Sequence, residues 1–251
     1  MKKILSTLVC AACLATVASA DFARVEVGAG MWMQTPSGDI TYVDGGATAS
    51  DVSDEKSKDQ FYLWALVKHP IPIVPNLRLE YAGIESTGAA TGTFKNFTAS
   101  GGDTSFKVTE YDIIPYYNLL DNTFWVTVDV GIDVKIMEID YTAEGVSIPG
   151  VASTSYSDSI TVPLPLLYLR ARTEIPMTDI GLEADVKYIS YDSNTVYDAR
   201  VKVDYTLDFI PIIQPAIEVG YRVQKIETDD GEDAKINMDF AGVYAGLMLR
   251  F

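Results

Sequence analysis

The chain ends with the stretch Ala241-Gly242-Val243-Tyr244-Ala245-Gly246-Leu247-Met248-Leu249-Arg250-Phe251, in which apolar side chains recur at every second position. The residues that share this apolar face are Val243, Ala245, Leu247, Leu249 and Phe251. A period of two indicates a β-strand whose two faces meet different surroundings. Since no turn follows the strand, we expect it to pair with a strand formed earlier, and pairing with the first strand would close a barrel.

The first twenty residues have the layout of a secretory signal peptide. A charged start precedes an apolar stretch, and Ala18-Ser19-Ala20 forms an A-x-A cleavage pattern. A lipoprotein signal is the alternative, because Cys10 and Cys13 lie in the apolar stretch, but the A-x-A pattern fits ordinary cleavage better. We therefore expect a signal peptide over residues 1–20, and one domain over residues 21–251 that is exported through the periplasm.

Composition excludes several classes of function for the mature chain. Both cysteines fall within the signal, so disulfides, thiolate metal sites and cysteine nucleophiles are excluded. Without Lys2 and Lys3, 17 basic residues stand against 35 acidic ones, a net charge of −18 that repels nucleic acid. After the signal, no apolar run approaches the ~18 residues that a spanning helix requires.

The rest of the chain alternates between apolar and polar residues, most clearly over residues 124–137. Val128 and Ile132 belong to one face, whereas Asp129 and Asp133 belong to the other. A soluble sandwich turns its apolar face inward, whereas a membrane barrel turns it toward lipid. Alternation alone does not distinguish the two, but the connections do.

Ten candidate strands can be assigned, and two kinds of connection alternate between them. The strands are 22–34, 58–68, 77–87, 104–114, 123–138, 158–174, 180–191, 196–208, 216–227 and 236–251. Short, often proline-bearing connections cover 69–76, 115–122, 175–179 and 209–215, and mostly longer polar ones cover 35–57, 88–103, 139–157, 192–195 and 228–235. Short turns at one rim and longer loops at the other are typical of outer-membrane barrels. The pattern predicts an all-β fold: a closed, antiparallel, transmembrane up-and-down β-barrel of about ten strands, with eight as the alternative.

Charged residues recur at spacing two on the polar faces of these strands. They are Arg24 and Glu26; Arg78 and Glu80; Glu110 and Asp112; Asp129, Asp133 and Lys135; Arg170, Arg172 and Glu174; Glu183, Asp185 and Lys187; Arg200, Lys202 and Asp204; and Glu218 and Arg222. In a closed barrel these side chains would converge in the lumen, where we expect ion pairs and trapped water. The alternative is the solvated face of ordinary sheets. Trp125 is a further bulky candidate for the lumen.

Two strands are ambiguous. In 58–68 both faces are apolar, so the lipid-facing set stays open. In 158–174, Ile160 shares its face with Arg170, although one face cannot both meet lipid and carry charges in mid-membrane. A bulge near Pro163 or Pro165 would shift the alternation and remove this conflict. Tyrosine and tryptophan are frequent enough to form interfacial girdles. The candidates are Trp32, Tyr81, Tyr111, Tyr168, Tyr188, Tyr205 and Tyr221.

The stretch Val27-Gly28-Ala29-Gly30-Met31-Trp32-Met33-Gln34-Thr35-Pro36-Ser37-Gly38-Asp39-Ile40 resembles the opening of a family of small, largely uncharacterised outer-membrane β-barrel proteins of Gram-negative bacteria. The closing Leu249-Arg250-Phe251 resembles the terminal signature that the barrel-assembly machinery recognises. The resemblance covers nearly the whole mature chain and implies an outer-membrane location. It implies no activity and no functional residues.

No catalytic, cofactor-binding or metal-binding residue is predicted. The one histidine, His69, lies beside Pro70 in a short turn, and Asp129 with Asp133 lacks an organised nucleophile or oxyanion donor. The acidic run Asp229-Asp230-Gly231-Glu232-Asp233 lacks the spacing of an EF-hand, so a solvated loop tip is expected. Weak cation bridging to lipopolysaccharide phosphates is the alternative for that loop.

The sequence thus predicts a non-enzymatic outer-membrane barrel with a charged lumen that is plugged by side chains, in a structural or interaction role. About ten strands lie nearer the filled than the open size of barrels, which favours the plugged lumen. The alternative is a narrow, porin-like channel, which would prefer cations because the chain has so many acidic residues. The expected partners are outer-membrane lipids, lipopolysaccharide and, through Phe251, the barrel-assembly machinery.

Overall fold

The computed structural model describes residues 23–44, 47–94, 97–144, 146–147, 155–192, 194–207, 213–229 and 234–251. The predicted signal peptide, residues 1–20, lies outside these ranges. Within them, no helix is long and apolar enough to cross a membrane.

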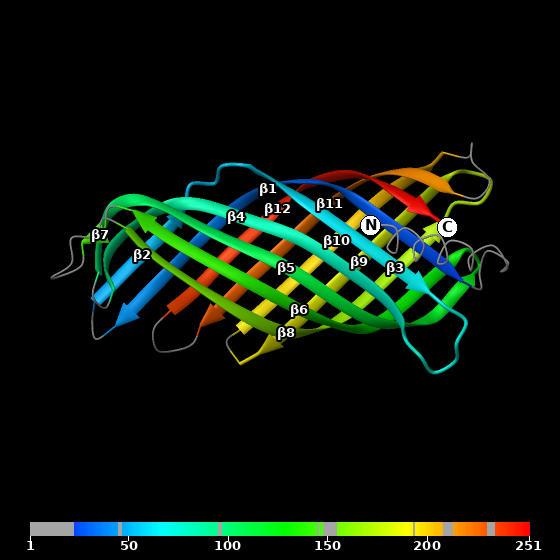
Figure 1. Cartoon of the computed structure of the whole chain (residues 1–251), viewed down its shortest axis with the longest axis horizontal. Helices are drawn as coiled ribbons and strands as arrows, with labels where there is room; N and C mark the ends of the chain where they lie inside the picture. Colours follow the sequence, from blue (N-terminus) through cyan, green and yellow to red (C-terminus); the bar gives the residue numbers. More distant parts are fainter. Residues whose placement is uncertain are drawn as a thin grey trace, which may run out of the picture.

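The described residues form one antiparallel sheet of twelve strands (Figure 1). They are β1 (Arg24–Asp44), β2 (Ala47–Ser53), β3 (Lys58–Lys68), β4 (Asn76–Phe94), β5 (Phe97–Thr123), β6 (Val126–Glu144), β7 (Val146–Ser147), β8 (Ser155–Glu174), β9 (Ile180–Tyr191), β10 (Asn194–Thr206), β11 (Gln214–Asp229) and β12 (Ala234–Arg250). β2 and β3 both pair with β1 and with β4, so they are two parts of one wall segment, and β7 is a short addition to β5. Ten wall segments therefore surround the lumen, as the sequence predicts.

The first and last strands close the ring. β1 pairs with β12 from Glu26–Arg250 to Tyr42–Ala234. The amide of Phe251 donates to the carbonyl oxygen of Val25 at 2.9 Å, which extends the pairing to the last residue. The expected partner of the C-terminal strand is thus confirmed.

The strands are tilted, and the two rims differ. Followed once around the ring, the register leads from Ser37 of β1 to Val25 of the same strand, a stagger of twelve residues. Such a stagger accompanies strands inclined to the barrel axis. We call the end of the barrel that has the short connections, where β1 begins and β12 ends, the turn rim. The opposite end, where β1 leads to β2 and β4 leads to β5, is the loop rim.

Several predicted strand limits were too short. β1, β4 and β6 continue far into the segments 35–57, 88–103 and 139–157 that were assigned to loops. The connection predicted at 115–122 is also wrong, because β5 continues to Thr123 and the turn lies at Phe124–Trp125. Both turn residues have a positive φ, which allows this tight reversal in spite of their bulk.

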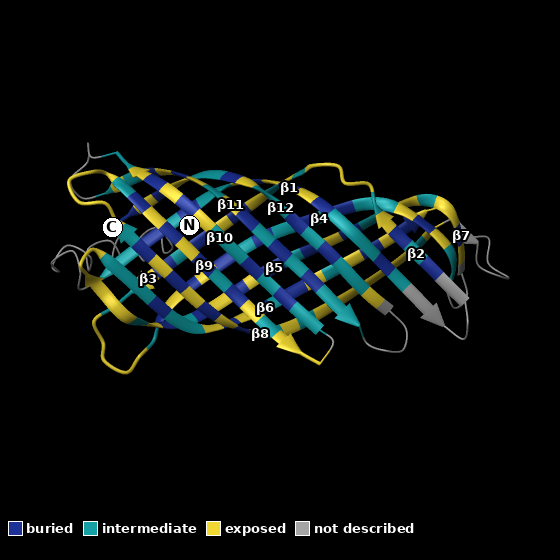
Figure 2. Cartoon of the chain, turned by 180° about the vertical axis from the view of Figure 1, so that it is seen from behind, coloured by how far each residue is buried: buried dark blue, intermediate teal, exposed yellow. Residues whose placement is uncertain are grey.

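The outer surface is apolar, and burial alternates along each strand (Figure 2). Large apolar side chains remain exposed all around the wall, for example Leu63 (47%), Ile132 (57%), Leu167 (60%), Val201 (56%) and Leu247 (66%). An apolar face of this extent on a closed ring suits a hydrocarbon environment. In β3 the inward set is Tyr62, Trp64 and Leu66, which settles the face that the sequence left open.

Inward positions change character along the strands. On β6, Asp129 and Lys135 lie toward the turn rim, whereas Met137 and Ala143 lie toward the loop rim. On β5, Glu110 gives way to Phe106 in the same direction. The lumen therefore has a charged layer near the turn rim and a mostly apolar layer near the loop rim, in which Asp51 is buried and accepts from Thr104.

The bulge expected in 158–174 is absent, and the change from a charged to an apolar layer explains the mixed inward positions of this strand. β8 pairs with β6 from Ser155 to Thr173 without a shift in register. Inward positions of β8 simply pass from Arg170 into the apolar layer, where Leu164 packs against the buried core. Pro163 and Pro165 have no N–H to donate to a neighbouring strand. They lie on the part of β8 that pairs with β6 but not with β9, since the β8–β9 pairing begins at Leu167.

Most of the tyrosines predicted for the girdle lie on the outer wall. Tyr111 (40%), Tyr188 (48%), Tyr205 (49%) and Tyr221 (47%) are exposed on the outer wall, and Tyr81 is half-buried beside Tyr111. Trp32 and Tyr168 were wrongly assigned to it, since both are buried inside the lumen at 1% and 0% exposure.

Candidate functional site

The charged layer of the lumen is the most distinctive chemical feature of the described residues, and we call it the plug. Its carboxylates are Glu26, Glu80, Glu110, Asp112, Asp129, Asp133, Glu183, Asp185, Asp198, Asp204 and Glu218. Its basic side chains are Arg78, Lys135, Arg170, Arg172, Lys187, Arg200, Lys202, Arg222 and Arg250. Acids outnumber bases by two in these sets. Because almost all are fully buried, each charge needs a partner within the lumen.

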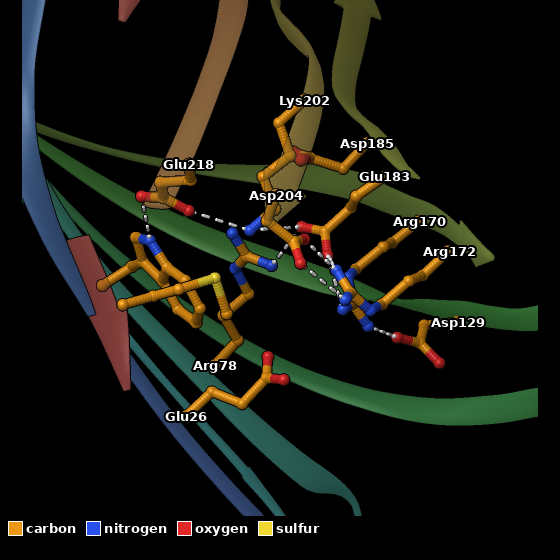
Figure 3. A network of polar contacts seen from close by, with 12 residues as sticks. Glu26, Arg78, Asp129, Arg170, Arg172, Glu183, Asp185, Lys202, Asp204 and Glu218 are labelled. Atoms are coloured by element: carbon orange, nitrogen blue, oxygen red, sulfur yellow. Dashed lines mark hydrogen bonds and ion pairs between the residues drawn. The ribbon is translucent and has the colours of Figure 1, made fainter. Parts of the chain in front are cut away.

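Glu183 on β9 is the hub nearest the turn rim (Figure 3). Its carboxylate lies 2.6 Å from Arg170, 3.3 Å from Arg78 and 3.4 Å from Arg172. Lys202 completes the set at 3.5 Å. These bases come from β4, β8 and β10, so one carboxylate ties together strands on different sides of the barrel.

Arg250 links the chain end to this hub. Its guanidinium lies 2.6 Å from Asp204 and 3.0 Å from Glu26. Asp204 also accepts from Arg172 at 2.7 Å. The charged residue beside the terminal Phe251 is thus held inside the plug, next to the seam between β1 and β12.

Two lysines organise the middle of the plug. Lys187 donates to Glu80 at 2.5 Å, to Asp112, and to Asp198 at 3.4 Å. Lys135 lies 2.9 Å from Asp112 and 3.3 Å from Glu110. These contacts join β4, β5, β6, β9 and β10 across the lumen.

Arginines bridge the remaining width. Arg222 of β11 lies 2.7 Å from Asp198 and 3.1 Å from Glu110. Arg200 of β10 lies 2.6 Å from Glu80 and 2.8 Å from Asp185. Charge-assisted bonds of this kind are shorter and stronger than neutral ones.

Aromatic rings fill the space beside the charges. Tyr62 and Trp64 donate to the same oxygen of Glu218, at 2.7 and 3.0 Å. Lys202 lies 4.5 Å from the centre of the Trp64 ring, in the geometry of a cation–π contact. Gly28 makes room for that ring, because a Cβ at this position would fall 2.4 Å from the indole nitrogen.

Asp133 differs from every other carboxylate of the plug. It is fully buried, and neither of its oxygens has a hydrogen-bonding partner among the described residues. The residue directly opposite on β8 is the buried, apolar Leu166. An ionised carboxylate in such a place is costly unless it acquires a partner.

Little space remains in this lumen. A cavity of about 20 Å³ lies between Trp32, Trp64 and Arg200 in the plug, and one of about 30 Å³ lies at the turn-rim mouth beside Arg24 and Trp125. Volumes of this size hold roughly one or two water molecules. The plug can therefore hold strands together and obstruct ions, and the two cavities beside it are too small for a substrate.

Sequence reasoning located most of the plug. The charged residues predicted at spacing two are buried, except for Arg200, whose side chain is 10% exposed, and for Arg24 and Glu174, which pair with each other at 3.1 Å at the mouth. Trp125 does not fill the lumen, because it lies in the β5–β6 turn and is 57% exposed. Asp198 and Arg250 were not among the predicted charges, although both have inward parity on their strands. That parity is the signal that could have identified them.

The remaining candidates lie away from the plug. His69 is in the β3–β4 turn: its Nδ1 accepts from the amide of Ile71 at 3.2 Å and its Nε2 lies 3.0 Å from the carbonyl oxygen of Pro75. Of the acidic run at 229–233, only Asp229 is described, and it lies 3.5 Å from Lys235. No group of three or more potential metal-ligating side chains occurs in the described ranges.

We predict that Asp133→Asn leaves stability unchanged or raises it, because the substitution removes a buried charge that has no hydrogen-bonding partner among the described residues. The matched variant Asp112→Asn removes a partner of both Lys135 and Lys187 and should cost about 3–5 kcal/mol. Unfolding in urea, followed in detergent micelles, measures both. Equal losses in the two variants would contradict this account of Asp133.

We also predict that Gly28→Ala destabilises the barrel by about 1–3 kcal/mol, because the new methyl group overlaps the buried Trp64 ring. Gly83→Ala is the control: its Cβ would meet mainly the flexible end of Gln60. Thermal unfolding of both variants in detergent gives the comparison, and a Gly28→Ala variant as stable as Gly83→Ala would refute the close packing.

Comparison with known proteins supports the fold and leaves the family open. No protein-family model and no curated protein matches the sequence. Among solved structures, the outer membrane protease OmpT from Escherichia coli is similar over 94% of this chain and 100% of its own, with a TM-score of 0.56 and 11% identity. The translocator domain of the autotransporter NalP from Neisseria meningitidis matches 100% of this chain and 96% of its own, with a TM-score of 0.40 and 12% identity. The outer membrane protein AlkL matches 94% of each chain, with a TM-score of 0.37 and 14% identity.

The likeness to OmpT shows the fold alone, since the sequences share so little. Taken with the closed ring, it confirms the predicted fold, a closed antiparallel β-barrel that resembles those of the outer membrane, here with a buried, charged interior and an apolar outer wall.

Proposed function

We propose that this protein is a sealed barrel of the outer membrane with a structural or interaction role and no catalytic activity. One observation carries the proposal: ion pairs cross the lumen from wall to wall. Arg78 of β4 reaches Glu183 of β9, and Arg222 of β11 reaches Glu110 of β5. A lumen bridged in this way serves the stability of the wall rather than passage through it.

The apolar layer supports the same proposal against the channel alternative. Phe106 and Phe240 stack with their ring centres 6.5 Å apart, and both are buried above the plug on the loop-rim side. An ion that enters from that side would have to pass between buried apolar side chains such as Phe106 and Met238, with Asp51 beside them, before it reached the plug. Both layers would have to rearrange before a path opened.

The chemistry of the candidate residues supports a non-enzymatic role. Both ring nitrogens of His69 are engaged with the backbone of its own turn. Asp129 is engaged by Arg170 at 2.6 Å and by Asn118 at 2.5 Å. Groups held in this way are poorly suited to act as a general base or nucleophile. The protease activity of OmpT belongs to that protein, and a shared fold does not transfer it.

The proposed partners follow from the membrane location and from the chain end. Outer-membrane lipids would surround the apolar wall, with lipopolysaccharide at the loop rim. The barrel-assembly machinery would recognise Phe251, whose backbone closes the ring against Val25. We further propose that the protein belongs with the small, uncharacterised outer-membrane barrels that its opening stretch resembles.

Conductance in planar lipid bilayers tests the sealed lumen. We expect the wild-type protein to give no steady current, because the plug and the apolar layer both obstruct the lumen. Heat-dependent migration on a gel would establish that the added protein is a folded barrel. Steady, cation-preferring currents from folded protein would support the channel instead.

The role of the last residue can be tested by Phe251→Ser, with Phe251→Tyr as the conservative control. We expect the serine variant to reach the outer membrane in lower amounts while it still refolds in detergent, because backbone pairing with Val25 does not need the aromatic ring. Normal amounts of folded Phe251→Ser in cells would contradict recognition through this side chain.

A further inference from the structure

The β3–β4 connection at the turn rim is an exposed apolar loop. Between His69 and Asn76 it contains only Pro70, Ile71, Pro72, Ile73, Val74 and Pro75, with no charged or polar side chain. Ile71 is 58% exposed, Ile73 90% and Val74 49%. Such a concentration of exposed apolar surface on one short loop calls for a binding partner.

The loop is rigid. Three prolines restrict its backbone. His69 braces it from one end, since its ring accepts from the amide of Ile71 and contacts the carbonyl oxygen of Pro75. Ile73 has a φ of 73°, a conformation that β-branched residues rarely adopt. The fold therefore holds Ile73 in a strained conformation and leaves its side chain outside.

The loop lies against the outer wall of the barrel. The hydroxyl group of Tyr117, an exposed residue of β5, donates to the carbonyl oxygen of Ile73 at 2.6 Å. Figures 1 and 2 show the connection between β3 and β4 projecting sideways from the wall rather than along the barrel axis. Ile73 is thus placed at the side of the barrel, next to the surface that faces lipid.

We propose that this loop, residues 70–75, inserts into the periplasmic leaflet of the outer membrane and anchors the barrel at the boundary between headgroups and acyl chains. The inference rests on the proposed membrane location. Its occupant is a phospholipid surface because the loop lies beside the apolar outer wall, to which the Tyr117 bond holds it. Neighbouring exposed residues of that wall are Leu77 (37%), Leu119 (63%) and Leu120 (43%).

Other connections of the turn rim point to the same occupant. Phe124 in the β5–β6 turn is 83% exposed and Met177 in the β8–β9 turn is fully exposed, and both have a positive φ. Several charged residues of this rim line the lumen mouth instead, where Lys68 lies 2.6 Å from Asp121. Apolar tips on several sides of a ring suit a surrounding bilayer better than a globular partner that contacts one side.

Depth-dependent fluorescence quenching tests the anchor. Ile71→Trp, in a Trp125→Phe background, is reconstituted into phosphatidylcholine vesicles with or without brominated acyl chains, and aqueous iodide is added separately. Two reference variants in the same background are used. Leu167→Trp on the outer wall represents a tryptophan in lipid, and Tyr191→Trp at the loop rim, where the native side chain is 78% exposed, represents a tryptophan in water. The remaining tryptophans, Trp32 and Trp64, are buried in the plug and give a common background.

We expect Ile71→Trp to emit to the blue of Tyr191→Trp, to be quenched by bromolipid and to be shielded from iodide. If it behaves like Tyr191→Trp while Leu167→Trp is quenched by bromolipid, the barrel is in the membrane and the loop is in water, which overturns the anchor alone. If Leu167→Trp is not quenched by bromolipid, the membrane location fails and the anchor fails with it.

Discussion

The neutralisation of buried charge is the constraint on which the rest of this structure depends. Turning apolar side chains toward lipid forces the alternate residues inward, and here many of those residues are charged. A lone charge in such an interior would cost several kcal/mol, and all the plug charges except Asp133 contact a counter-charge, in most cases on another strand. Contacts such as Arg78–Glu183 and Arg250–Asp204 therefore connect segments that are distant in sequence and determine which side chains meet.

Charge pairing alone does not seal the lumen. Aromatic rings such as Trp64 occupy the space that the pairs leave, and glycines such as Gly28 allow the rings to approach the wall. Toward the loop rim, apolar residues such as Phe240 replace the charges. The interior thus combines a polar network with a core like that of a soluble protein, within a barrel whose outer face is also apolar. Apolar side chains thus lie on both the inner and the outer face of the barrel wall.

The turn rim shows how a short connection can carry more than a reversal of direction. The loop between β3 and β4 accepts backbone strain at Ile73 and is braced by the one histidine of the chain. Strain of this kind, about 1–3 kcal/mol per residue, persists only where the surroundings hold it in place. The bond from Tyr117 supplies such a constraint from the outer wall. The loop is therefore attached to the barrel wall at this rim by a hydrogen bond as well as by its two strands.

The sequence by itself determined the barrel, its ten wall segments and the inward parity of nearly all the plug, because a period of two follows directly from strand geometry. It misplaced Trp32, and it called for a bulge in 158–174, because parity shows which side of the wall a residue faces and not what lies on that side. The apolar layer of the lumen, the partner of each charge and the unpaired state of Asp133 were decided only by the tertiary structure. These features depend on the stagger between strands, which sets the height of each residue along the barrel axis and is determined by the closed ring as a whole.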